Sequence, residues 1–155
     1  MKNLSVIVPC YNYETYISNN IEKLTNKLRV HNIDHEIIII NDGSLDNTKN
    51  KIETLLKDKR IILINNKNNK GKSYSIINAL PICKFNKILL IDCDMPYFEY
   101  LDKALFEIYN NYDLICINRR SKQSLLTNKN LSSYQKTRHR IGNFIGKLIN
   151  FFFKN

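Results

Sequence analysis

The stretch Lys87–Tyr97, "KILLIDCDMPY", decides the fold, because it reads as a buried strand that ends in two carboxylates. The run Ile88–Ile91 is entirely apolar, which is typical of a strand buried on both faces of a parallel sheet. Asp92 and Asp94 follow it, one residue apart. Charges at the edge of a core cost free energy unless a cation or hydrogen-bond donors compensate them. The partner of this pair is therefore expected to bear on function.

Other short apolar runs alternate with helical patterns along the chain. The predicted strands are Leu4–Val8, Glu36–Ile40, Ile61–Ile64, Ile88–Ile91 and Leu114–Ile117. Between them, apolar residues recur at spacings of three and four, as on the buried face of an amphipathic helix. This alternation predicts an α/β fold with a mainly parallel sheet, flanked by helices and joined by right-handed crossovers.

The chain of 155 residues is long enough for one domain with its own core. We expect residues 1–155 to form a single domain whose sheet-containing core is 1–120. The polar, aperiodic segment 121–137 is predicted to be a mobile loop. Segment 138–155 has an apolar face bordered by basic residues, which predicts an amphipathic helix. Such a helix could lie on a membrane surface or pack on the sheet or on a partner.

Composition limits the class of protein. The 24 Lys and Arg residues against 14 Asp and Glu give a net charge of +10, which favours phosphates, anionic lipid or nucleic acid as partners unless it reflects compositional bias. No helix-turn-helix, zinc-finger or aromatic sheet motif is present, so nucleic acid is not the expected partner. Four widely spaced cysteines, without a Cys-x-x-Cys pair, indicate reduced thiols and a cytoplasmic setting. Neither a signal peptide nor a membrane span is predicted.

Polar motifs follow every predicted strand. They are "PCYNYE" (9–14), "NDGSLDNT" (41–48), "NNKNNKGKS" (65–73), "DCDMP" (92–96) and "NRRSK" (118–122). Ligands of open parallel sheets bind outside the carboxyl ends of the strands. These aromatic, acidic, glycine-containing and basic groups are therefore expected to converge on one edge of the sheet.

Each motif has a chemical interpretation and a structural one. Tyr11 could stack on a base, or it could be a core tyrosine. Asp42 could accept the imide N–H of uracil or the equivalent edge of guanine; alternatively, it is a second capping residue beside Ser44, the predicted N-cap of the next helix. Gly71 and Lys72 precede a helix, whose N-terminal N–H groups suit a phosphate.

Asp92 and Asp94 are the most specific pair. Residues i and i+2 of an extended strand point the same way, so both carboxylates could bind one divalent cation, which prefers oxygen ligands. Such an ion would cancel their repulsion and bridge to a diphosphate. The alternative is a strand-end turn with Asp94 capping the following helix.

Four ordered blocks, "SVIVPCYNYETYI", "EIIIINDGSLDNT", "NKGKSYSIINAL" and "ILLIDCDMP", together resemble the nucleotide-binding half of family 2 glycosyltransferases. The resemblance covers residues 4 to about 120 and implies the Rossmann-like GT-A fold, with 1–120 as the nucleotide-sugar-binding core. It also implies a metal-dependent hexosyltransferase that uses UDP- or GDP-sugars. The resemblance implies that Pro9, Tyr11, Asn12 and Glu14 line the nucleoside pocket and that Asp42 binds the base. Gly71 and Lys72 would lie near the phosphates. Asp92 and Asp94 would form the Asp-x-Asp pair that binds Mg²⁺ or Mn²⁺.

Within that family the chain is most similar to polyprenyl- or dolichyl-phosphate sugar synthases. This likeness implies that Arg120 and Arg138 face phosphates and, with Asp94, serve catalysis. Pro96 stands where those enzymes commonly carry glutamine, and Gly142 where a serine would follow the helix arginine.

The sequence ends before the region in which the family completes its acceptor site. A polyprenyl phosphate acceptor is already anionic and needs no general base, so it is compatible with a sequence that lacks the region where the base would lie. With such an acceptor the chain is expected to be peripheral at a membrane. The alternative is a truncated, non-catalytic module that binds nucleotide sugars or another protein. A partner chain or a second copy could also complete the site.

Overall fold

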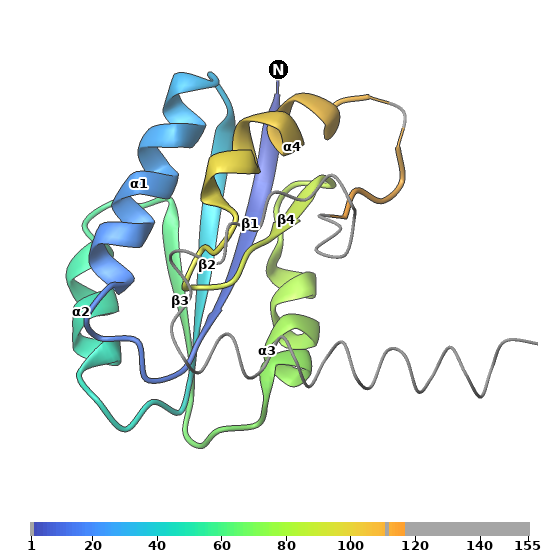
Figure 1. The fold of residues 1–155 in the computed structure, drawn as a ribbon. Helices are drawn as coiled ribbons and strands as arrows, with labels where there is room; N and C mark the ends of the chain where they lie inside the picture. Colours follow the sequence, from blue (N-terminus) through green and yellow to red (C-terminus); the bar gives the residue numbers. More distant parts are fainter. Residues whose placement is uncertain (1, 111, 117–155) are drawn as a thin grey trace, which may run out of the picture. The chain divides into compact units, whose positions relative to one another are not determined.

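The computed structural model describes residues 2–110 and 112–116, and these residues form an α/β fold (Figure 1). The elements, in chain order, are β1 (Asn3–Cys10), α1 (Ile17–Val30), β2 (Asp34–Asp42), α2 (Thr48–Leu55), β3 (Ile61–Asn66), α3 (Lys72–Ala79), the 3₁₀ turn η1 (Leu80–Ile82), β4 (Ile88–Leu90), the 3₁₀ turn η2 (Phe98–Tyr100) and α4 (Leu101–Glu107).

The strands form one parallel sheet in the order β3-β2-β1-β4. Strand β1 pairs with β2 from Asn3 opposite Asp34 to Cys10 opposite Asn41. The same register continues outward, because Asn41 of β2 lies opposite Asn65 of β3. The predicted parallel sheet is therefore confirmed, and the carboxyl ends of β1, β2 and β3 lie side by side.

Helices cover both faces of the sheet (Figure 1). One hydrophobic cluster joins β1 and β2 to the apolar faces of α1, α2 and α4 through residues such as Leu24, Ile52 and Leu105. A smaller cluster on the opposite face packs Ala79 and Ile76 of α3 against β1 and β2. Strand side chains alternate between these clusters, which is why the central strands read as continuous apolar runs.

The outer strands are less buried than the sequence predicts. Ile88 and Leu90 of β4 are 38% and 46% exposed, so the prediction that Ile88–Ile91 is buried on both faces is wrong. The reason is that α3 packs against β1 and β2, the two central strands. In β3, residues Ile62 to Ile64 are only partly buried, as befits the strand at the other edge.

The predicted strand Leu114–Ile117 is also wrong for the residues described, because Leu114, Ile115 and Cys116 are irregular and exposed. An apolar run becomes a strand only if it pairs with a neighbouring strand. The preceding strand, β4, is at the edge of the sheet but is only three residues long, so it offers little backbone for pairing. Arg120, Arg138, the predicted loop 121–137 and the predicted helix 138–155 lie outside the described residues. Among the helices of the described part, none is both long and apolar enough to span a membrane.

Candidate active site

Four loops meet at the carboxyl end of the sheet, one after each strand. Hydrogen bonds tie the loop after β1 to the loop after β2. The N–H of Asn12 donates to Ser44 Oγ (3.0 Å), and the N–H of Leu45 donates to Asn12 Oδ1 (2.8 Å). Asn12 adopts a φ of 52°, a left-handed conformation that asparagine tolerates well. Asn12 is thus fixed by the neighbouring loop at the edge where the sequence predicts it.

Glu14 takes part in a second set of these contacts. Its Oε2 accepts from the N–H of Asn47 (2.7 Å), and its own N–H donates to Asp46 Oδ2 (3.1 Å). Thr48 Oγ1 accepts from the N–H of Tyr13 (2.6 Å). These bonds give Glu14 a structural role in joining the two loops.

The predicted N-cap at Ser44 is wrong. Helix α2 begins at Thr48, with Asn47 in the N-cap position. Ser44 lies three residues earlier and uses its hydroxyl on Asn12, because the turn after β2 is longer than the sequence suggests. The Asn12 and Ser44 loops are therefore held by side chain to main chain bonds and not by a helix cap.

Tyr11 is an exposed side chain, 43% accessible, at the end of β1. The alternative that it is a core tyrosine is therefore wrong, and its ring is available to a ligand. The partly buried tyrosine is Tyr13, which packs against the larger cluster. Burial, together with the nearby charge of Asp94, raises the pKa of Tyr13 to about 12. Pro9, at the end of β1, is only partly buried and lies opposite Ile40.

Asp42, the last residue of β2, is only 4% exposed and holds the loop after β3. Its Oδ1 accepts from Asn66 Nδ2 (2.8 Å) and from the N–H of Lys70 (3.0 Å). Its Oδ2 accepts from the N–H of Gly71 (2.8 Å). A carboxylate offers about four acceptor positions, so these three bonds occupy most of them.

Opposing effects act on the ionisation of Asp42. Burial disfavours the charged form, but the hydrogen bonds from Lys70, Asn66, Gly71 and Ser75 favour it more strongly, so the pKa of Asp42 is lowered. The alternative that Asp42 caps α2 is wrong in detail. It accepts main-chain N–H groups, but these belong to the residues that precede α3.

Gly43 explains how the loops after β2 and β3 come so close. It has a φ of 68°, and a Cβ atom there would lie 2.4 Å from the carbonyl carbon of Asn68. Only glycine fits such a backbone contact. Gly71, at a φ of 90°, has open space around it and occupies the N-cap position of α3. The "DG" dipeptide marks a turn at Gly43, but its contact with Asn68 and the bond from Asn66 to Asp42 were not predicted.

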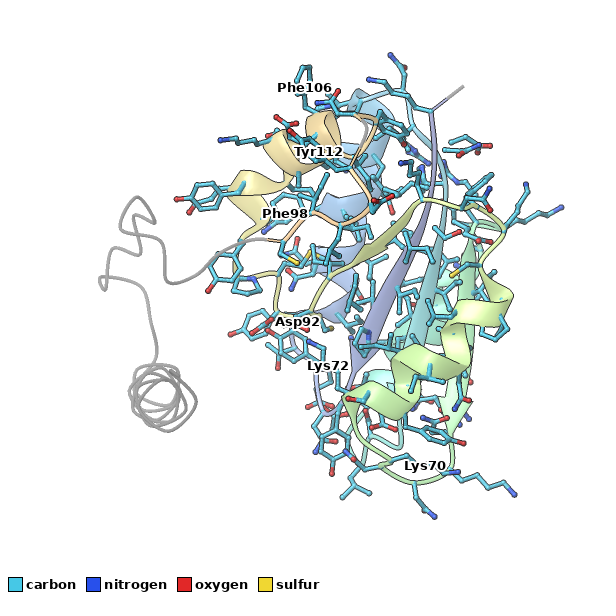
Figure 2. All side chains as sticks on the ribbon, turned by 90° about the vertical axis from the view of Figure 1, so that its right-hand side faces the viewer. Lys70, Lys72, Asp92, Phe98, Phe106 and Tyr112 are labelled. Carbon is cyan, nitrogen blue, oxygen red and sulfur yellow. The ribbon has the colours of Figure 1, made fainter. Side chains whose placement is uncertain are left out.

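Lys72, the first residue of α3, points at the loop after β4 (Figure 2). Its Nζ forms an ion pair and a hydrogen bond with Asp92 Oδ1. The two side chains are 52% and 33% exposed. The structure thus places the predicted phosphate-binding lysine against the first of the two predicted metal ligands.

Asp92 and Asp94 lie in a turn beyond the end of β4, closed by a hydrogen bond from the N–H of Met95 to the carbonyl of Asp92 (2.9 Å). Strand alternation therefore does not orient them, contrary to the prediction. Instead Asp92 faces Lys72, and Asp94 lies near Tyr13. Asp94 does not cap the following helix either, since α4 begins at Leu101 with Tyr100 as its N-cap.

Asn20 of α1 anchors the same turn, because its Nδ2 donates to the carbonyl of Cys93 (2.8 Å). The sequence analysis missed this residue, which lies on the polar side of a predicted helix and carries no motif. Across the described residues there is no group of three His, Cys, Asp or Glu side chains that could hold a metal ion. Two carboxylates alone still suit a Mg²⁺ or Mn²⁺ ion that takes its other ligands from water and substrate phosphates.

Comparison with known proteins decides the family. The family model "Glycosyl transferase family 2" matches residues 5–153. This chain belongs to glycosyl transferase family 2. It is also 30% identical, over 122 residues, to an uncharacterized glycosyltransferase of Synechocystis, a match that covers 77% of this chain and 38% of that protein. The chain therefore spans less than half the length of this curated relative.

Solved structures agree with the predicted fold. The chain is similar to residues 1–349 of Staphylococcus aureus TarS in complex with UDP-GlcNAc, with a TM-score of 0.53 and 27% identity over 69% of this chain and 31% of that one. A mannosyltransferase from Pyrobaculum calidifontis, in complex with GDP-Man and Mn²⁺, has a TM-score of 0.56 at 18% identity and covers 70% and 32% respectively. The predicted GT-A fold is confirmed.

Proposed function

We propose that this chain carries the nucleotide-sugar-binding part of a glycosyltransferase that takes its sugar from a UDP- or GDP-sugar. The observation that carries the proposal is the convergence of Tyr11, Asp42, Lys72 and the Asp92–Asp94 turn at one end of the sheet. TarS was solved with UDP-GlcNAc, which supports the same class of donor.

In this proposal the base lies against the exposed ring of Tyr11, a stacking contact worth about 1 kcal/mol or more. Asp42 accepts a base N–H, and the hydrogen bonds from the loop after β3 keep that carboxylate ionised. Pro9, Asn12 and Glu14 complete the nucleoside side of the pocket. The hydrogen bonds of Asn12 and Glu14 to the loop after β2 fix the shape of this part of the pocket before the ligand arrives.

The diphosphate is proposed to lie between Gly71, Lys72 and the two aspartates. Departure of the diphosphate develops negative charge, which the ammonium of Lys72 would stabilise. A divalent ion held by Asp92 and Asp94, when bound, would supply Lewis-acid stabilisation of the same charge. Arg120 and Arg138 are proposed to add positive charge on the acceptor side.

For the acceptor we propose a polyprenyl phosphate. The net charge of +10 favours an anionic partner, and the basic, apolar sequence of 138–155 suits a membrane surface. A phosphate acceptor is already ionised near neutral pH. Attack on the sugar therefore needs no general base from this chain.

The donor site is tested by thermal stabilisation of the full chain. UDP, GDP and their sugars are screened with and without Mn²⁺, and a ligand at 100 times its dissociation constant should stabilise the protein by about 2.7 kcal/mol. Absence of a shift with every nucleotide, metal included, would refute the donor site.

Turnover is tested separately by incubating the chain with a radiolabelled sugar nucleotide and a polyprenyl phosphate extract. We expect label in the lipid fraction and its loss in an Asp94→Ala variant. Nucleotide binding without transfer to any acceptor would support the non-catalytic binding module in place of the enzyme.

A further inference from the structure

The ion pair between Lys72 and Asp92 joins two elements that are distant in the sequence, the first turn of α3 and the turn after β4. Both side chains are partly exposed, with 52% and 33% of their surface accessible. Ion pairs exposed to this degree contribute about 0–1 kcal/mol, because water screens them. The pair can therefore be exchanged for other partners at small cost.

Asp92 and Asp94 suit a metal ion that takes its remaining ligands from water and from the phosphates of the substrate. Within the described residues no third acidic, histidine or cysteine side chain joins Asp92 and Asp94, and Pro96 offers no side-chain donor. Mg²⁺ is typically held by one or two carboxylates plus substrate phosphates. An ammonium already seated at Asp92 also repels a divalent cation, since like charges a few ångströms apart interact unfavourably even in water.

We propose that Lys72 is the resident counter-ion of Asp92 in the nucleotide-free protein and exchanges partners when a metal–diphosphate complex binds. Asp92 then passes from the ammonium to the metal, and the ammonium turns to the diphosphate. The proposal rests on the donor site described under the proposed function and adds an order of events: nucleotide and metal enter together, and each raises the affinity for the other.

The geometry around Lys72 permits such a movement. The main chain ahead of it is fixed, because Asp42 accepts the N–H of Gly71 (2.8 Å). The lysine side chain has a four-carbon stem, so its Nζ can change partner while its Cα stays in place. No rearrangement of the fold is required.

Metal binding without any nucleotide gives the most direct test. Mn²⁺ is titrated into the full chain, and free Mn²⁺ is followed by electron paramagnetic resonance. Removal of the competing ammonium in a Lys72→Met variant should tighten Mn²⁺ binding by about threefold to tenfold. The same variant should bind UDP or GDP, at saturating Mn²⁺, at least about threefold more weakly, because the phosphate contact is lost.

Lys70→Met is the matched control. It removes the same charge two residues away, and the Lys70 ammonium contacts the hydroxyl of Tyr74 (3.1 Å), away from the Lys72–Asp92 pair. Its Mn²⁺ affinity should stay close to that of the wild type. Equal tightening in both variants would mean that net charge alone is responsible, and would overturn the proposal.

Unchanged, weaker or undetectable Mn²⁺ binding by the Lys72→Met variant would overturn it as well. This result is distinct from failure of the proposed function, which would appear as absence of nucleotide binding by the wild-type chain. The metal titration contains no nucleotide, so the two failures cannot be confused.

Discussion

The carboxyl ends of β2 and β4 each present a carboxylate to the same region, but the two are held very differently. Asp42, the last residue of β2, is buried and accepts three hydrogen bonds, one from the end of β3 and two from the loop that follows it. Asp92, after β4, is partly exposed and forms an ion pair with Lys72, whose side chain has a long, flexible stem. The first carboxylate is part of the fold, whereas the second is available for exchange. The donor site thus combines a fixed nucleoside end with an adaptable phosphate end.

The largest expected effect that separates these ends is on stability. Asp42→Ala should lower the free energy of unfolding by about 1.5–3 kcal/mol, because the side chain of Asn66 and the N–H groups of Lys70 and Gly71 lose a charged acceptor. Asp92→Ala should change it by less than about 1 kcal/mol. Urea unfolding of both variants, followed by circular dichroism, measures the difference. Similar losses in the two variants would contradict the comparison.

Substitution of Gly43 and of Gly71 by alanine tests how closely the loops after β2 and β3 approach each other. Gly43→Ala should cost about 2 kcal/mol or more, because its Cβ would collide with the main chain of Asn68 as well as strain a positive φ. Gly71→Ala should cost less, about 1–3 kcal/mol, since its Cβ meets open space and only the backbone strain at φ 90° and ψ 157° remains. Thermal melts of both variants provide the measurement, and a reversed order would show that the loops after β2 and β3 do not depend on that close approach.

The smallest expected effect is a pH dependence at Asp42. Its folded pKa is lowered below the ordinary value of 3.8, so its ionised form contributes stability that is complete above that value and is lost as the pH falls through the folded pKa. The difference in unfolding free energy between wild type and Asp42→Asn should therefore shrink from about pH 6 to about pH 3. Urea titrations across this range test it. A difference that grew toward low pH would have the wrong sign.

Much of the fold follows from the sequence because the central strands are buried on both faces. The runs around Ile7 and Ile38 have no polar side, so their periodicity predicts buried parallel strands without ambiguity. The burial of residues at and beyond the edge of the sheet cannot be predicted in the same way. Apolar content at Ile88 or Leu114 does not reveal whether a helix or a neighbouring strand is present to cover it.

The sequence predicts which residues lie at this end of the sheet better than it predicts their contacts. Motifs at strand ends locate Tyr11, Asp42 and Lys72 at one edge, because parallel strands place their carboxyl ends together. The partners of Asp42 and the pairing of Lys72 with Asp92 could not be predicted. They depend on loop paths fixed by the Gly43 contact and by the turn after β4, which spacing along the chain does not encode.

The hydrogen bonds from the loop after β3 to Asp42 determine which substitutions that loop should tolerate. Two of its three hydrogen bonds come from main-chain N–H groups, which residues other than proline all carry. Side chains at positions 67 and 68 can accordingly vary while the loop keeps its path, whereas Asn69 Oδ1 also accepts the N–H of Gly71 (3.1 Å). At these two positions a substitution should change the chemistry of the surface without changing the path of the main chain.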